Sequence, residues 1–171
     1  MNQVAVFSKV SEIIFADSYR KCFPDASASE ARDALKNVSI PCRATKGSAG
    51  YDFFLPCDIK LNAGESFTVP TGIRVRIDDG WVLMVFPRSG LGFRYRLQLD
   101  NTVGVIDSDY YDSDNEGHIM IRITNDSKEP KTLQLRAGDR FAQGIFLPYG
   151  ITYDDQTEKE RNGGFGSTGE S

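Results

Sequence analysis

The sequence of 171 residues predicts an all-β protein organised as a single domain, 1–171. Three observations predict this class. Short apolar segments alternate with polar residues, Gly, Pro and Asn stand at the breaks between them, and the helix-strand alternation of a parallel sheet is not visible. A chain of this length can bury one continuous core. We therefore expect a β-sandwich or β-barrel.

The overall composition is that of an ordinary globular protein, with 40% hydrophobic and 26% charged residues. The net charge of -4 argues against nonspecific binding to nucleic acid or anionic lipid. No apolar run approaches the ~20 residues of a membrane span. The three cysteines show no CxxC spacing, and MNQVAVFSKV lacks the features of a targeting sequence. We expect a cytoplasmic protein without nucleic-acid or membrane partners, in a bacterial cell or, if a phage encodes it, in the host cytoplasm.

Two short helices are predicted within an insertion at about 11–42. Ser11 can cap the first helix, which ends before Pro24. Ser27 and Glu30 have the spacing of a capping box at the start of the second helix. The apolar face of this second helix holds Ala31, Ala34, Leu35 and Val38. The insertion is expected to be either surface elaboration or a partner-binding face.

The strands are predicted from the alternation of apolar residues at every second position. Gln3 to Phe7 forms the first strand, and the continuous apolar run WVLMVF, 81–86, predicts a strand buried on both faces. Alternating apolar positions on other strands are Phe67, Val69, Ile73, Val75, Ile77, Ile119, Ile121 and Ile123. The final segment, about 154–171, has almost no apolar residue apart from Phe165, and it is predicted to be a flexible arm.

The segment GVIDSDYYDSDNEG, 104–117, concentrates carboxylates. Four of its residues fit an EF-hand calcium loop, but Ile123 stands where a bidentate glutamate is required, and the flanks alternate as strands. We therefore set calcium aside and expect residues 112–116 to form a solvated hairpin tip. Asp107 and Asp109 differ, because a carboxylate beside the apolar GVI needs a specific reason to be there.

Two motifs offer groups that bind anions. PRSGLG, 87–92, places an arginine and free backbone N–H groups at a strand end, which suits phosphate, although an arginine in a turn is more often part of a surface ion pair. RNGGFGSTG, 161–169, is either a flexible tail or an arm that closes on a ligand, and it lacks the spacing and the lysine of a Walker A loop. The lone His118 is expected to be an ordinary exposed or half-buried residue, and the cysteines packed or idle thiols.

Five motifs, taken in order, resemble those of the homotrimeric dUTP pyrophosphatase (dUTPase) family. They are SAGYDFF (48–54), PRSGLG (87–92), NTVGVIDSDY (101–110), GDRFAQGIF (138–146) and RNGGFGSTG (161–169). The resemblance extends from about Lys46 to the C-terminus. It implies a jelly-roll-like β fold, dUTP as the substrate, and a homotrimer with three active sites at the subunit interfaces.

The resemblance also implies roles for individual residues. Asp107 corresponds to the aspartate that activates the attacking water, and Tyr110 to the aromatic residue that excludes a 2'-hydroxyl. The uracil-reading residues are Asn101, Gly104, Val105 and Ile106, with Met120 adjoining them. The phosphate-contacting residues are Arg88, Ser89, Gly90 and Gln143. The closing arm contributes Arg161, Phe165, Gly166 and Ser167, with Phe165 stacking over uracil. Asp52 and Asp109 would support the site.

The implied reaction, hydrolysis of dUTP to dUMP and pyrophosphate, needs in-line attack of water on the α-phosphorus. An aspartate is ionised at neutral pH and can accept the proton of that water. A set of protein ligands for a metal is not evident, so we expect Mg²⁺ to be bound through substrate phosphates and water. The reaction would limit uracil incorporation into DNA and supply dUMP for thymidylate synthesis.

Two other functions remain open. The related dCTP deaminase shares the fold and the RS turn, although VIDSDY and Phe165 favour uracil and pyrophosphate release. A nucleotide-gated regulatory protein is the second alternative. It would bind a protein partner through the insertion at 11–42 or through the hairpin at 111–116, which is longer than in the shorter members of the family.

Overall fold

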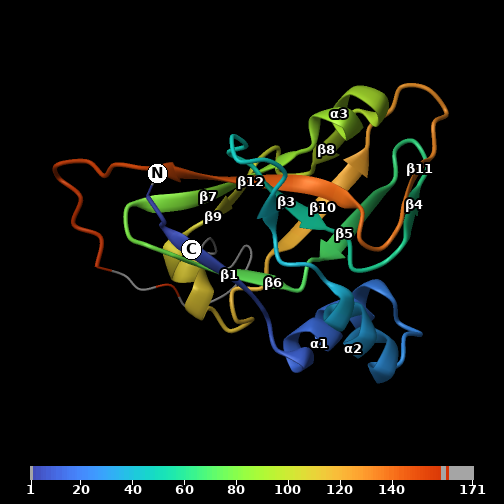
Figure 1. Ribbon diagram of the computed structural model, residues 1–171, viewed down its shortest axis with the longest axis horizontal. Coiled ribbons are helices and arrows are strands. Elements are labelled where there is room, and N and C mark those ends of the chain that lie inside the picture. The colour runs from blue at the N-terminus through green and yellow to red at the C-terminus, as the bar shows by residue number, and fades with distance from the viewer. Residues whose placement is uncertain (1, 159–160, 162–171) are drawn as a thin grey trace.

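The computed structural model describes residues 2–158 and 161, and this part of the chain folds mainly into β-strands (Figure 1). The strands are β1 (Ala5–Lys9), β2 (Cys42–Arg43), β3 (Tyr51–Phe54), β4 (Ile59–Leu61), β5 (Ser66–Pro70), β6 (Ile73–Ile77), β7 (Trp81–Pro87), β8 (Leu97–Leu99), β9 (Gly104–Ile106), β10 (Met120–Asn125), β11 (Leu133–Leu135) and β12 (Arg140–Pro148). The helices are α1 (Glu12–Cys22), α2 (Ala28–Asn37), α3 (Ser89–Tyr95) and the 3-10 helix η1 (Ser108–Asp112). The predicted all-β class is confirmed.

Within the described residues the strands pair antiparallel in four sheets. The largest has the order β2-β3-β12-β7-β9, and a second has the order β5-β10-β8. The pairs β1-β6 and β11-β4 complete the set. Both larger sheets contribute to one core, whose fully buried side chains include Phe53, Leu83, Val69, Ile123 and Phe141. Each helix in this part of the chain is too short or too polar to cross a membrane.

Strand β7 corrects one prediction. Leu83 and Val85 are buried, but the residues between and beside them are only half-buried, so the run at 81–86 is fully covered on one face alone. Val105 lies opposite Met84 in the register of β9 and is 52% exposed. An apolar run indicates that both faces of a strand are suited to burial. It does not show whether the same chain buries both faces.

The N-terminal region follows the predicted capping signals closely. Strand β1 is displaced from the expected 3–7 and pairs with β6. The hydroxyl of Ser11 accepts the amide of Ile14, and both halves of the capping box between Ser27 and Glu30 are present. Figure 1 shows α1 and α2 side by side below β5, where α1 contacts that strand. Phe15 of α1 and Leu35 of α2 share a small buried cluster with Val10, so the two helices are anchored to the domain.

The acidic segment is not the expected solvated hairpin. Strand β9 pairs with β7 and β10 pairs with β5 and β8, so the strands on either side of the segment lie in different sheets. Asp112 and Asp114 are exposed, but Ser113 and Gly117 are buried. The Glu116 carboxylate accepts the backbone N–H of Ser11 at 2.8 Å, just before α1. This hydrogen bond lowers the pKa of Glu116.

Candidate active site

The end of β7 carries the first group of predicted site residues. Arg88 Nε lies 3.0 Å from Asp52 Oδ1, and Arg140 lies 3.2 Å from Asp52 Oδ2. Asp52 on β3 is only 6% exposed, so its charge is stabilised by two arginines instead of water. The sequence motif containing Arg140 was identified, but the pairing of this arginine with Asp52 was not foreseen.

Gln143 of β12 joins this group through the sheet register, because it lies opposite both Asp52 and Phe86. Its side-chain amide donates to the Pro87 carbonyl at 3.2 Å. A Cβ at Gly50 would lie 2.7 Å from Gln143 Oε1, so a larger residue there would displace the Gln143 amide. We call Asp52, Arg88, Arg140 and Gln143 the strand-end group.

The predicted turn PRSGLG is in fact the end of β7 followed by α3, with Arg88 at the N-cap position. Ser89 and Gly90 belong to the first turn of this helix, where backbone N–H groups have no intrahelical acceptor. A Cβ at Gly90 would meet nothing within 4 Å. The strand end therefore presents amide donors beside guanidinium groups, which suits an anion.

Asp107, Asp109, Tyr110 and Arg161 form a second cluster, which we call the carboxylate group. Arg161 donates to Asp107 Oδ2 at 2.7 Å, and its Nε lies 3.0 Å from Asp109 Oδ1 as an ion pair. Its guanidinium carbon lies 5.5 Å from the centre of the Tyr110 ring. The side chains of Asp107 and Asp109 are 50% and 54% exposed, so both carboxylates remain accessible to solvent.

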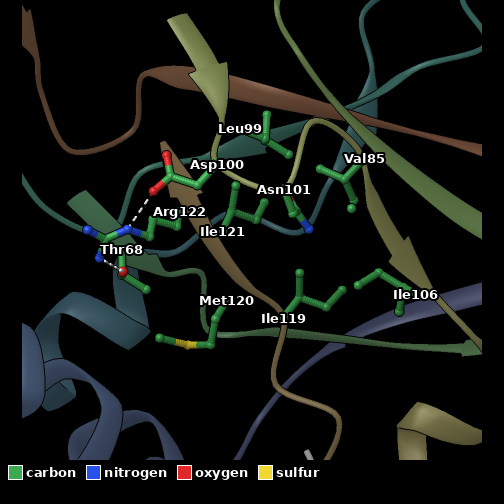
Figure 2. A pocket seen from close by; sticks show the side chains of 11 residues that line it. Thr68, Val85, Leu99, Asp100, Asn101, Ile106, Ile119, Met120, Ile121 and Arg122 are labelled. Atoms are coloured by element: carbon green, nitrogen blue, oxygen red, sulfur yellow. Dashed lines mark hydrogen bonds and ion pairs between the residues drawn. The ribbon is translucent and has the colours of Figure 1, made fainter. Parts of the chain in front are cut away.

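An apolar pocket of about 440 Å³ lies between β8, β9 and β10 (Figure 2). Four of the predicted uracil-reading residues line it, namely Asn101, Gly104, Ile106 and Met120. Val105 does not line it, since it points to the other face of β9. Figure 2 also shows Arg122 between Asp100 and Thr68, to which it is hydrogen-bonded. These three pocket residues were missed, because nothing in their local sequence distinguishes them from surface residues.

Asp107 and Arg88 lie toward opposite ends of β7. Ile106 lies opposite Leu83 in the register, so Asp107 follows toward the Trp81 end, whereas Arg88 follows Pro87. About six residues of strand separate these two levels, which corresponds to about 20 Å. Among residues 2–158 and 161, no hydrogen bond or ion pair joins the strand-end group to the carboxylate group. A single chain therefore does not bring these predicted residues together.

His118 corrects a further prediction, because it is completely buried. Both ring nitrogens have partners: the Gly72 N–H donates to Nε2 at 2.9 Å, and Nδ1 lies 3.2 Å from Ser18 Oγ. Burial lowers the pKa of His118 to about 4, against a weaker opposing effect of Glu116. The remaining predicted residues, Phe165, Gly166 and Ser167, lie outside the described residues.

The fold and this geometry define a class: an all-β protein with two separate sites of different chemistry. One is an apolar pocket that ends beside carboxylates, which suits a flat ring, and the other is the strand end, whose cations and amides suit an anion.

Comparisons with known proteins narrow this class. The model of the dUTPase family matches residues 36–169. The deoxyuridine 5'-triphosphate nucleotidohydrolase of Lactococcus lactis subsp. lactis is 40% identical over 135 residues, which are 77% of this chain and 89% of that protein. The chain belongs to the dUTPase family. The match begins within α2, so α1 lies before it.

Solved structures agree with this assignment. The crystal structure of the dUTPase from Streptococcus mutans is similar with a TM-score of 0.60 and 38% identity, over 68% of this chain and 90% of that one. A mutant dUTPase from phage phi11 of S. aureus, described with a structural Mg(II) ion, has a TM-score of 0.59 and 25% identity, over 72% and 92%. These likenesses confirm the predicted jelly-roll-like fold.

Proposed function

We propose that this member of the dUTPase family hydrolyses dUTP to dUMP and pyrophosphate, with Asp107 as the base that activates water. The observation that carries this assignment of roles is the position of Asp107: it is a half-exposed carboxylate directly after Ile106, which lines the apolar pocket. A nucleotide whose base enters the pocket would place its α-phosphate near this carboxylate. Family membership supports the substrate.

The pocket supplies the recognition of the base and sugar in this proposal. Its apolar walls accept the faces of uracil, while the side-chain amide of Asn101 and the backbone of Gly104 can satisfy the polar edge of the ring. Tyr110 would contact deoxyribose and leave no space for a 2'-hydroxyl. Burial raises the pKa of Tyr110, so the phenol stays protonated and neutral.

Arg161 determines in this proposal when Asp107 is free to act as the base. In the structure its guanidinium binds Asp107 and Asp109. Phosphate oxygens compete well for a guanidinium, so an arriving triphosphate can draw Arg161 away and leave Asp107 to accept a proton from water. Phe165 would stack over uracil, and Gly166 and Ser167 would contact phosphate in the same arm. These last three assignments rest on the family resemblance.

Magnesium remains part of the proposal as an ion bound through substrate phosphates and water. Among residues 2–158 and 161, three or more His, Cys, Asp or Glu side chains do not gather in an arrangement that could hold a metal. Asp107 and Asp109 are instead paired with Arg161. When bound, Mg²⁺ would neutralise developing charge on the triphosphate.

We also propose that a complete site needs more than one subunit, and that the assembly is the expected homotrimer. The separation of about 20 Å along β7 supports this, because a dUTP bound near Asp107 would need cations that its own chain holds elsewhere. The outer face of the large sheet supports it too. Met84, Val105 and Leu147 lie on that face, and they are half-buried or exposed. A second copy of the chain would cover them.

Pyrophosphate release from dUTP, dCTP, dTTP and UTP, with and without Mg²⁺, tests the proposed function. We expect release from dUTP alone among the four at low nucleotide concentration, and a strong dependence on Mg²⁺. Ammonia production from dCTP would instead support the deaminase alternative, which the named relatives do not favour. Equal rates with all four nucleotides would contradict the proposed pocket.

The regulatory alternative stays a separate prediction. One feature of α1 favours it: Ile13 is 81% exposed, which is unusual for an isoleucine on a helix. An Ile13→Asp variant should keep full turnover of dUTP. Loss of nucleotide-dependent binding to a purified partner in this variant, with unchanged turnover, would support a role for the insertion in binding.

A further inference from the structure

The hydroxyl of Tyr110 is held by a hydrogen bond to a backbone carbonyl. This hydroxyl donates to the carbonyl of His118 at 2.8 Å and accepts the side-chain amide of Asn115 at 2.8 Å. The tyrosine is only 3% exposed. The placement of its ring therefore depends on where the main chain at His118 lies.

The main chain at His118 is in turn fixed by its own imidazole. Because the Gly72 N–H donates to Nε2, this nitrogen carries no proton, and the neutral ring must carry its proton on Nδ1. Nδ1 then donates to the hydroxyl of Ser18 on α1, 3.2 Å away. One buried ring thus connects α1 and the turn before β6 to the segment that holds Tyr110.

Neighbouring contacts make this connection rigid. The Ile119 N–H donates to the Ile73 carbonyl at 2.9 Å, and Thr71 Oγ1 donates to the Ile119 carbonyl at 2.6 Å. Gly72 has a positive φ of 71°, and a Cβ there would lie 2.9 Å from Leu35 and 3.2 Å from Phe15. The helices therefore pack directly on the turn that binds the imidazole, which leaves the ring little freedom.

Charge does not disturb the arrangement near neutral pH. Burial lowers the pKa of His118 to about 4, so the ring stays neutral. The charged group that raises this pKa is Glu116, which already accepts the N–H of Ser11. A second proton on the ring would face the Gly72 N–H, so the neutral tautomer is the one that fits.

We infer that His118 is a positioning residue for sugar selection: held by Gly72 and Ser18, it fixes the carbonyl that orients Tyr110, and it thereby makes α1 part of the nucleotide site. This inference rests on the proposed function, in which Tyr110 excludes a 2'-hydroxyl. It assigns a role in selectivity to a helix that lies before the matched family region.

Four variants test the inference. His118→Phe fills the space but removes both ring hydrogen bonds, and His118→Gln keeps an acceptor that can reach the Gly72 N–H. Ser18→Ala removes the hydroxyl on α1 alone. Leu133→Ala is the control for stability, because Leu133 is fully buried on β11, in a different sheet. The readout is the ratio of kcat/KM for dUTP to that for UTP.

We expect His118→Phe to lower this ratio about five- to ten-fold, the effect of one misplaced buried hydrogen-bonding group. Ser18→Ala should lower it by a smaller factor, and His118→Gln should restore most of it. Leu133→Ala should destabilise the protein and leave the ratio unchanged. An unchanged ratio in both His118→Phe and Ser18→Ala, with stability reduced as in the control, would overturn the inference. If His118→Phe does not fold, the dUTP to UTP ratios of Ser18→Ala and His118→Gln are compared. A lower ratio in Ser18→Ala than in His118→Gln would support the inference, and equal, unchanged ratios would overturn it.

A binding measurement separates this inference from the proposed function. Affinities for nonhydrolysable analogues of dUTP and UTP give a selectivity ratio without turnover. Absence of dUTP hydrolysis by the wild type would refute the proposed function, while the affinity ratios of the variants would still test the role of His118.

The chain has one histidine, so ¹⁵N-histidine labelling reports a single imidazole. We expect its spectrum to show the neutral Nδ1–H form and to shift when the dUTP analogue binds. A rapidly exchanging mixture of tautomers would contradict the fixed ring.

Discussion

The strand-end group and the carboxylate group are held in place by different means. Asp52 and Gln143 face each other because β3 and β12 pair in register, so the sheet itself determines their positions. Tyr110 lies in η1, outside any strand, and its hydroxyl is bonded to the His118 carbonyl. The His118 ring is in turn bonded to Gly72 and Ser18, which are distant in the sequence. The strand-end group should therefore tolerate substitutions at neighbouring residues. The selectivity for dUTP over UTP depends instead on a series of single hydrogen bonds.

The largest expected effect is in the carboxylate group. Asp107→Asn keeps the size of the side chain but removes its capacity to accept a proton, so turnover of dUTP should fall by about 10² to 10⁴. Nucleotide binding should persist. Pyrophosphate release, compared with the affinity for a nonhydrolysable dUTP analogue, measures both. Turnover near that of the wild type would remove Asp107 from the proposed role.

The buried histidine should make stability depend on pH. The pKa of His118 is about 4 in the folded protein and about 6.5 in the unfolded chain. Below pH 6.5 the unfolded chain therefore binds a proton that the folded protein does not, and stability falls until about pH 4. The loss amounts to about 3 kcal/mol. Urea unfolding of the wild type and His118→Gln between pH 7 and pH 4 isolates this contribution. Parallel plots of unfolding free energy against pH for the two proteins would contradict this contribution of His118.

In the strand-end group, Asp52→Asn should reduce stability by about 1–2 kcal/mol, because Arg88 and Arg140 lose their buried counter-charge. The effect is limited because both arginines are partly exposed. The ratio of dUTP to UTP turnover should stay constant, in contrast to the variants of His118. Urea denaturation and the two turnover rates are sufficient to check this. A change in selectivity would mean that the two groups are coupled more closely than the fold indicates.

The smallest effect on stability is expected for Tyr110→Phe, which removes one hydroxyl and keeps the aromatic ring. The cost should be about 1 kcal/mol in stability, with the His118 carbonyl losing one donor. The dUTP to UTP ratio should fall about as far as in His118→Phe, because the hydrogen bond from the Tyr110 hydroxyl to the His118 carbonyl is the contact through which His118 orients the ring. An unchanged ratio in Tyr110→Phe would show that packing alone orients the ring and would contradict the role given to that carbonyl.

The features that could be predicted from the sequence are those that local chemistry determines. Caps at Ser11 and Ser27 need only the next three residues, and the alternation of Ile119, Ile121 and Ile123 needs only one strand. The motif resemblance identified Asp107 and Arg161, which the structure places in contact.

The features that could not be predicted are contacts between residues far apart in the chain. Glu116 and Ser11 are separated by 105 positions, and His118 and Ser18 by 100. The sequence around His118 looks like the ordinary start of a strand. The burial of His118 could not be predicted from it, because this burial depends on helices from a distant part of the chain. The solvated hairpin was wrongly predicted for the same reason, since its charges suggest exposure while Glu116 binds the chain just before α1.

The central claim is that Asp107 and Arg88 of one site come from different subunits, and mixing two inactive variants tests it most directly. Asp107→Asn and Arg88→Ala are each expected to be nearly inactive alone. Unfolded and refolded together in equal amounts, they should form assemblies in which about a quarter of the sites combine an intact Asp107 with an intact Arg88 from another chain. We therefore expect roughly a quarter of wild-type turnover from the mixture. Mixed assemblies no more active than either variant alone would show that both residues act within one chain, and would contradict the account.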